Sequence, residues 1–263
     1  MSDIAFFWSH YWTGIAAATG MMFVLWLASI PLKNVSIVDL FWGAGFVLVA
    51  GAYLWSLDGE WTPRRILVGA LVAVWGLRLS IYLTMRNVGH GEDFRYQKFR
   101  SDFGDGYWWY SLPSVFLLQG VLMWIISAPL LGAFVGDGTL GWIDYLGVAV
   151  WMFGFVFEAG SDWQLRRFKK DPANKGKLLT TGFWRYTRHP NYFGDATVWW
   201  GFGLLAVGAG SYFTVFGSAF MTALIIKVSG VALLETTMKN AKPGYEEYMR
   251  RTNAFLPWFP RKA

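Results

Sequence analysis

Long apolar runs constrain this chain more than any other feature of its sequence. A helix needs about 20 residues to cross the hydrocarbon core of a bilayer, and about seven runs have or approach that length. They cover residues 12–32, 37–57, 66–85, 112–133, 142–160, 192–208 and 212–234. We therefore expect an all-α integral membrane protein, with a bundle of about seven transmembrane helices.

The composition agrees with a membrane protein. Charged residues make up 15% of the chain, against about 25% in a typical soluble domain. The 17 tryptophans are expected where rings line the bilayer interfaces. Cysteine is absent, which excludes disulfides and thiolate chemistry, and the three histidines, His10, His90 and His189, have no metal-ligand spacing. We expect no metal site.

The distribution of basic residues predicts the orientation in the membrane. Residues 86–110, 160–190 and 235–263 hold four, eight and six Lys or Arg residues, whereas the intervening loops hold few. Basic loops stay in the cytoplasm, so we expect the N-terminus outside and the C-terminus in the cytoplasm. Attraction to anionic lipid explains most of these lysines, and we expect no nucleic-acid binding.

The organisation predicts one transmembrane domain over residues 1–263, without a linker or repeat. We expect residues 91–106 to form a loop that packs under the bundle. Pro243-Gly244 indicates a turn before a short helix at 245–251. Gly201-x-Gly203-x-x-Ala206 satisfies a loosened dinucleotide fingerprint, but it lies inside an apolar run. There, small residues favour close helix packing over cofactor binding.

The densest polar segment is LLTTGFWRYTRHPNYFG at residues 178–194, between two apolar runs. Its cations and hydrogen-bonding groups alternate with aromatic rings: Trp184, Arg185, Tyr186, Arg188, His189, Asn191 and Tyr192. Guanidinium groups bind phosphate bidentately, and flat rings stack on aromatic side chains. The segment predicts a cytoplasmic-face pocket for an anionic, aromatic ligand of the nucleotide type.

Further polar residues lie within or at the ends of the apolar runs, where an unpaired charge costs at least a few kcal/mol. They are Asp39, Arg78, Tyr82, Arg86, Glu158, Asp162, Arg166, Asp195 and Glu235. An internal salt bridge, such as Arg78 with Asp39 or Glu158, explains any one of these charges. The whole set instead predicts a hydrated cavity that holds a ligand.

These motifs resemble the steroid 5α-reductase family, and especially its bacterial DUF1295 branch. The resemblance covers nearly the whole chain and is carried by VDLFWG at 38–43, WGLRLSIYLTMRN at 75–87, EDFRYQKFR at 92–100, FEAGSDWQLRRFK at 157–169, GFWRYTRHPNYFGD at 182–195 and YEEYMRRTNAFLPWFP at 245–260. It implies a seven-helix membrane fold, with its C-terminal signature at about 157–260. It also implies NADPH-dependent reduction of the carbon–carbon double bond of an enone, such as a Δ4-3-oxosteroid.

The resemblance also implies roles for single residues. The expected cofactor-binding residues are Arg78, Arg86, Asn87, Glu158, Asp162, Arg166, Lys169, Arg185, Tyr186, Arg188, His189, Asn191, Tyr192, Asp195, Glu235 and Tyr248. Asp39 is the nearest match to the family's catalytic carboxylate. Trp75 lies near the position of the family's catalytic tyrosine, so Tyr82 or Tyr53 would have to act in its place, or the substrate differs.

Two other functions stay open. Membrane methyltransferases of the isoprenylcysteine carboxyl methyltransferase type share RHPNY-like motifs and use S-adenosylmethionine, which carries no phosphate. Phosphates of NADPH explain the cluster of Arg166, Arg167, Lys169, Arg185 and Arg188 better. The other candidate is a non-catalytic lipid-binding membrane protein or a transporter.

We expect a monomer in the bacterial inner membrane, in contact with membrane lipids. The cofactor site would lie on the cytoplasmic face, and a lipid-soluble substrate would enter from the bilayer. A steroid, a quinone, a polyprenyl enone and an acyl enone all remain possible substrates.

Overall fold

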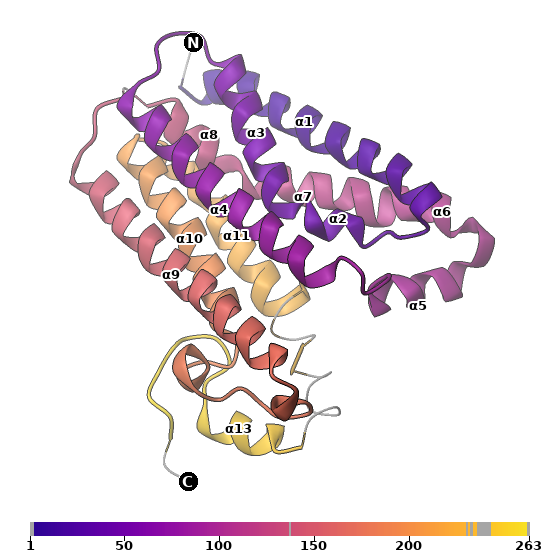
Figure 1. The fold of residues 1–263 in the computed structure, drawn as a ribbon. Coiled ribbons are helices and arrows are strands. Elements are labelled where there is room, and N and C mark those ends of the chain that lie inside the picture. The colour runs from indigo at the N-terminus through magenta and orange to yellow at the C-terminus, as the bar shows by residue number, and fades with distance from the viewer. Residues whose placement is uncertain (1–2, 137, 230, 232–233, 236–242, 262–263) are drawn as a thin grey trace. The chain divides into compact units, whose positions relative to one another are not determined.

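The computed structural model describes residues 3–136, 138–229, 231, 234–235 and 243–261 (Figure 1). Every regular element within these ranges is a helix. Four described helices are long and apolar enough to cross a membrane: Ala5–Leu32, Pro63–Asn87, Phe94–Phe134 and Trp142–Lys170. Two apolar helices are shorter, Trp42–Ser56 and Tyr212–Val228. The all-helical membrane fold is confirmed, while the count of seven spans and the orientation stay predictions.

The chain divides into two compact units. Unit 1 comprises Met1–Leu140 and Ala206–Thr214, and unit 2 comprises Gly141–Leu205 and Val215–Ala263. The prediction of one domain over the whole chain stays a prediction.

Unit 1 contains eight α-helices among its described residues. They are α1 (Asp3–Leu32), α2 (Ile37–Leu40), α3 (Trp42–Ser56), α4 (Pro63–Asn87), α5 (Phe94–Phe103), α6 (Tyr107–Ser111), α7 (Leu118–Ile126) and α8 (Ala128–Phe134). A 3-10 turn, Gly104–Gly106, precedes α6, and a π-helix, Leu112–Leu117, precedes α7. The apolar run 37–57 is interrupted at Phe41, and the run 112–133 is interrupted at Ser127.

The prediction of a loop at 91–106 was wrong, because α5 occupies most of this segment. The Asp93 side chain accepts from the backbone N–H of Arg95 and caps the helix at its N-terminus. Gly104, with φ 55°, ends it. The mixed charges of this segment thus lie on a largely exposed helix rather than on an irregular loop.

A glycine contact lets α3 and α4 approach closely. A Cβ atom added to Gly43 would lie 2.2 Å from the carbonyl oxygen of Gly76. A Cβ atom added to Gly76 would lie 2.4 Å from the carbonyl oxygen of Gly43. Only hydrogen side chains fit on both helices at this crossing.

Unit 2 contains α9 (Trp142–Lys170), most of α10 (Pro190–Gly208), α11 (Phe216–Leu224) and α13 (Tyr245–Arg251). Short 3-10 turns lie at Pro172–Asn174 and Gly182–Arg185, and a π-helix lies at Ile225–Ser229. A further 3-10 turn, Tyr212–Val215, spans the boundary between the two units in the sequence. The predicted short helix at 245–251 is confirmed, and Gly244, with φ 77°, forms the expected turn before it. Part of the predicted span 212–234 lies outside the described residues.

Glycines also bring α9 and α10 together. A Cβ atom on Gly194 would lie 2.4 Å from the backbone nitrogen of Glu158. On Gly201 it would lie 2.8 Å from the backbone nitrogen of Trp151. The fingerprint-like glycines at Gly201 and Gly203 lie inside α10, so the packing interpretation is confirmed.

The glycine contact in unit 1 is testable by substitution. We expect Gly76→Ala to destabilise the detergent-purified protein by about 1–3 kcal/mol, because the backbones of α3 and α4 must separate. Gly51→Ala is the matched control, since nothing lies within 4 Å of a Cβ atom at Gly51. The control should match or slightly exceed wild-type stability, because alanine favours helix. A Gly76→Ala melting temperature equal to that of Gly51→Ala would contradict the close approach.

Candidate functional site

The polar signature segment is anchored to the C-terminal half of α9 before it enters α10. The Gln164 side-chain oxygen accepts from the backbone N–H of Phe183 at 3.1 Å. The Trp184 indole N–H donates to the carbonyl oxygen of Ser161 at 3.2 Å. The Phe183 ring packs against Phe157, with centroids 4.9 Å apart. These contacts fix the segment that carries Arg185 to Asn191.

Arg188 is the centre of the polar cluster in unit 2. Its Nε and Nη2 donate to the two carboxylate oxygens of Glu235, at 2.8 and 2.7 Å. Its Nη1 donates to the carbonyl oxygens of Met249, at 3.1 Å, and Thr252. A guanidinium group has five N–H donors, so these four bonds use nearly all of them. The Arg188 side chain is only 8% exposed.

Glu235 collects two further donors. His189 Nε2 lies 2.8 Å from its Oε1, and the Tyr245 hydroxyl donates to the same oxygen at 3.0 Å. Burial raises the pKa of Glu235, but the hydrogen bonds and charge of its partners outweigh burial and lower the pKa to about 2. Glu235 is therefore an anion that joins Arg188 and His189 of the signature segment to Tyr245 of α13.

The C-terminal segment after α13 packs along the signature segment (Figure 1). The Arg188 N–H donates to the Asn253 carbonyl at 2.9 Å, and the Trp258 N–H donates to the Tyr186 carbonyl at 2.9 Å. The Tyr248 hydroxyl donates to the Trp184 carbonyl. Tyr248, which was expected to contact the cofactor, thus links α13 to the signature segment through this hydrogen bond.

The other predicted residues of unit 2 lie on α9, in the signature, or in the first turns of α10. Asn191 Nδ2 donates to Asp162 Oδ1 at 3.3 Å, which joins α10 to α9. The Tyr192 ring stacks on His189, with centroids 5.8 Å apart. Arg185 is exposed, and no described residue forms an ion pair with it. Glu158 and Asp162 are buried, Tyr186 and Asp195 are half-buried, and Arg166 and Lys169 are exposed.

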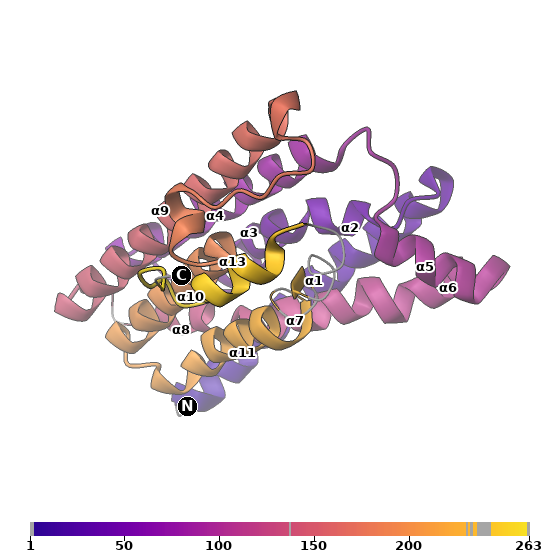
Figure 2. The ribbon, with the colours of Figure 1, turned by 90° about the horizontal axis from the view of Figure 1, so that it is seen from below.

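A second polar cluster lies in unit 1, around Asp39 in α2. Arg95 Nη2 donates to Asp39 Oδ2 at 2.9 Å, and the Tyr96 hydroxyl donates to Asp39 Oδ1 at 2.9 Å. The salt bridge suggested between Asp39 and Arg78 does not form, because Arg95 takes that place. Figure 2 shows α5, which carries Arg95 and Tyr96, beside α2.

Hydrogen bonds between the residues just before α5 and those just before α2 hold α5 beside α2. The Asp93 N–H donates to Ser36 Oγ at 2.6 Å, and the Val35 N–H donates to Glu92 Oε1 at 2.8 Å. Arg100 pairs with Glu92 at 2.9 Å. The sequence reasoning missed Arg95 and Tyr96, although the capping pattern that starts at Asp93 was a signal for a helix carrying both.

The remaining predicted residues of unit 1 are on α4. The guanidinium of Arg86 lies over the ring of Tyr82, 5.7 Å from its centroid, and its Nε donates to Asn87 Oδ1 at 3.0 Å. Arg78 and Tyr82 are half-buried.

The two other aromatic candidates pack in the core of unit 1. Trp75 is fully buried against Phe46, with centroids 5.7 Å apart. Tyr53 is fully buried and bonds to Ser127 at 2.7 Å. Their burial and contacts are those of core side chains.

Comparison with known proteins now identifies the family. The family described as "Protein of unknown function (DUF1295)" matches residues 25–252. The chain belongs to the DUF1295 family. This is a family of steroid 5α-reductase-like proteins. An uncharacterised protein of Schizosaccharomyces pombe is 26% identical over 265 residues, which is 89% of this chain and 76% of the relative. No solved structure matches the chain.

The ion pair between Arg188 and Glu235 predicts that the stability of this DUF1295 protein depends on pH. The pKa of Glu235 is near 4.5 when unfolded and about 2 when folded. Its stabilisation is therefore fully present above pH 4.5 and is lost as the pH falls toward 2. At neutral pH, Glu235→Gln should cost about 2 kcal/mol or more, because Arg188 keeps a buried charge without its counter-ion.

The measurement is the melting temperature from pH 7 down to pH 3 in detergent. The difference between wild type and Glu235→Gln should shrink as the pH falls. Glu247→Gln is the control, because Glu247 pairs with Arg251 at 3.6 Å on the surface and is 60% exposed. Its loss should cost less than about 1 kcal/mol. Equal losses in both variants would contradict the central role of Glu235.

Proposed function

We propose that this protein is an NADPH-dependent reductase of the carbon–carbon double bond of a membrane-soluble enone. Membership of a steroid 5α-reductase-like family supports the proposal. The observation that carries it is Arg185, an exposed guanidinium beside the buried Arg188–Glu235 pair. The pair fixes the backbone around a free phosphate-binding group.

The residues of unit 2 fit a phosphorylated nucleotide. Arg185, Arg166 and Lys169 are exposed cations suited to phosphate. Asp162 and Asn191 form a hydrogen-bonded pair, which suits ribose hydroxyls or a carboxamide. Tyr192 lies in the first turn of α10, where the helix dipole favours an anion.

Several predicted cofactor residues act as positioning residues in this proposal. Arg188, His189 and Glu235 bond to one another and to the C-terminal segment. Tyr248 bonds to the backbone of the signature. Their loss would displace Arg185 and Asn191 rather than remove a ligand contact. The predicted cofactor contacts of Glu158, Tyr186 and Asp195 in unit 2 belong to the proposal unchanged, and those of Arg78, Arg86 and Asn87 stay predictions.

When bound, NADPH supplies the hydride for the β-carbon of the enone. Negative charge then develops on the carbonyl oxygen, and a donor directed at that oxygen stabilises the transition state. We assign this task to the hydroxyl of Tyr96, whose oxygen lies 2.9 Å from Asp39 Oδ1. The Tyr96 proton is available to the substrate only when Asp39 is protonated and donates to the Tyr96 oxygen in that hydrogen bond. Arg95 holds Asp39 in position from the other carboxylate oxygen. Tyr82 stays the alternative tyrosine.

The substrate class follows from the membrane. Residues on the described apolar helices offer lipid-facing surface, so a lipid-soluble enone has access from the bilayer. The charge distribution supports a cofactor site on the cytoplasmic side. The bacterial inner membrane stays a prediction. The rival methyltransferase uses a cofactor without phosphate, so the two functions differ in their dependence on Arg185.

Cofactor binding is testable by thermal stabilisation, since a ligand bound only by the folded state raises its melting temperature. NADPH should stabilise the detergent-purified protein more than NADH, and S-adenosylmethionine should not stabilise it. Arg185→Gln should weaken NADPH binding at least tenfold, or about 1.4 kcal/mol. Arg250→Gln, which removes an exposed arginine of α13, is the matched control. Stabilisation by S-adenosylmethionine alone would contradict the proposal.

Enone activation is testable by turnover. Asp39→Asn and Tyr96→Phe should each lower NADPH oxidation with a Δ4-3-oxosteroid by about 10²–10³-fold, because charge on the carbonyl oxygen loses its donor. Both should keep the thermal response to NADPH. Asp102→Asn is the control, since Asp102 is an exposed carboxylate of the same helix, α5. Equal turnover in wild type and Asp39→Asn would refute the assignment of Asp39.

A further inference from the structure

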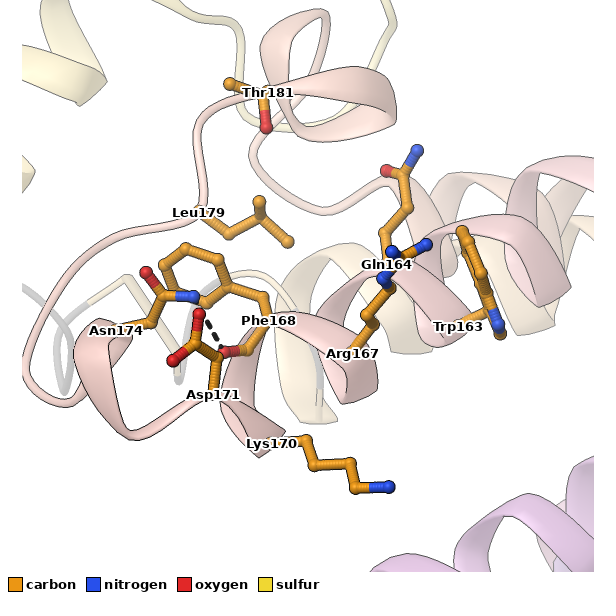
Figure 3. Close-up of a pocket in the computed structure, with 9 residues that line it drawn as sticks. All are labelled: Trp163, Gln164, Arg167, Phe168, Lys170, Asp171, Asn174, Leu179 and Thr181. Atoms are coloured by element: carbon orange, nitrogen blue, oxygen red, sulfur yellow. Dashed lines mark hydrogen bonds between the residues drawn. The ribbon is translucent and has the colours of Figure 1, made fainter.

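A groove of about 490 Å³ lies at the end of α9, and Arg167 is the one cation of the predicted phosphate cluster that lines it. Its lining comes from the last two turns of α9 and from the loop that follows: Trp163, Gln164, Arg167, Phe168, Lys170, Asp171, Asn174, Leu179 and Thr181. In Figure 3 the Arg167 side chain lies near Trp163, and Phe168 and Leu179 form the apolar part. All of these residues belong to unit 2.

Two exposed tryptophans of α9 indicate where the groove lies relative to the bilayer. Trp142 is 74% exposed at the start of α9, and Trp163 is 58% exposed near its end. A rise of about 1.5 Å per residue separates them by about 32 Å along the helix axis. This equals the thickness of a bilayer hydrocarbon core, about 30 Å, and tryptophans favour its two boundaries.

The exposed residues between the two tryptophans are of the kind expected inside the hydrocarbon core. Met152, Phe153 and Val156 are each more than half exposed and entirely apolar. Residues beyond Trp163 then lie at the level of the lipid headgroups. Arg167, Lys170 and the following loop are at that level, and so is the groove.

The chemistry of the groove suits an anion. Arg167 and Lys170 are exposed, and neither forms an ion pair with any residue that the structure describes. The guanidinium of Arg167 lies 5.4 Å from the centre of the Trp163 ring, which restricts its position. Asp171 is the one acid of the lining, and its Oδ1 accepts from the Ala173 N–H at 2.9 Å. The net charge of the lining is +1, two cations less one carboxylate.

The polar groups add hydrogen bonding. Asn174 Nδ2 donates to the Phe168 carbonyl at 3.1 Å, which fixes the loop against α9. The Thr181 hydroxyl, at the opposite side of the groove in Figure 3, is a further donor. Trp163, Phe168 and Leu179 supply apolar contact for the part of a lipid next to its headgroup.

We propose that this groove binds the phosphate headgroup of an anionic phospholipid. A lipid is favoured over a soluble anion because the groove lies at the level of headgroups and combines cations with apolar side chains. An anionic headgroup is favoured over a zwitterionic one because choline or ethanolamine would bring a cation toward Arg167 and Lys170. The proposal does not rest on the proposed reductase activity.

The last turn of α9 also carries these cations where they complement the helix dipole, and that effect alone needs no ligand. The test therefore compares ligands in detergent-purified, full-length protein. Short-chain dihexanoyl phosphatidylglycerol should raise the melting temperature, whereas equal concentrations of dihexanoyl phosphatidylcholine or inorganic phosphate should not. Native mass spectrometry should show one retained phosphatidylglycerol. An equal response to both lipids, or to inorganic phosphate, overturns the proposal.

The variant that tests the site is Arg167→Gln with Lys170→Gln. Both side chains are exposed, so folding should be kept, and the apparent Kd for phosphatidylglycerol should rise at least tenfold. The matched control is Arg250→Gln with Lys175→Gln, which removes two exposed cations outside the groove and should leave the Kd unchanged. Equal weakening in both double variants would mean nonspecific attraction and overturn the proposal.

The response to NADPH separates this proposal from the proposed function. Lys170→Gln alone, which leaves Arg167 in place, should keep the NADPH shift and weaken the response to phosphatidylglycerol, and Arg185→Gln should keep the phosphatidylglycerol shift. If Lys170→Gln loses the NADPH shift and keeps the lipid shift, the groove belongs to the cofactor and the lipid assignment is overturned.

Discussion

Polar side chains buried inside this protein are removed from water, so each must be satisfied by another group of the protein, and this requirement shapes both units. In unit 2 the requirement is met by the Arg188–Glu235 pair, at 2.7 and 2.8 Å. Removing one partner would leave the other as a buried charge, which is strongly destabilising. The remaining donors of Arg188 bond to backbone carbonyls of the C-terminal segment. The Arg188 side chain thus links the signature segment to Glu235 and to the end of α13.

The same requirement distinguishes a buried arginine that holds the structure together from an exposed arginine that can meet a ligand. Arg188 and Arg185 are three residues apart in one polar segment, yet their roles differ. Arg188 is 8% exposed and bonds to four acceptors, whereas Arg185 is exposed. In the proposed function, the rigid buried Arg188 would hold the backbone beside Arg185, so that little backbone freedom would be lost when a phosphate binds. In unit 1, Arg95 has the corresponding structural role toward Asp39.

Helix packing in this protein depends on glycine. At Gly43 and Gly76, and at Gly194 and Gly201, a methyl group would overlap a neighbouring backbone. Lipid tails are as apolar as the side chains, so burial of apolar surface adds little to helix association in a membrane. Close packing between helix backbones stabilises the association instead. The glycines of α10 illustrate how a pattern that looks like a nucleotide fingerprint arises from packing alone.

The sequence by itself determined the helical membrane class, the family resemblance and the segment that carries the polar cluster. Apolar runs of membrane length, and the density of polar groups at 178–194, are local properties that need no knowledge of contacts. The short helix at 245–251 followed in the same way from the Pro243-Gly244 turn.

The partners of each polar residue were decided only by the tertiary structure. Asp39 pairs with Arg95 rather than Arg78, and Glu235 joins Arg188, His189 and Tyr245, which are separated from one another by up to 57 residues. The sequence shows which charges need a partner, because desolvation acts on each residue alone. Which partner is chosen depends on distances between helices, and glycine contacts and turns set those distances.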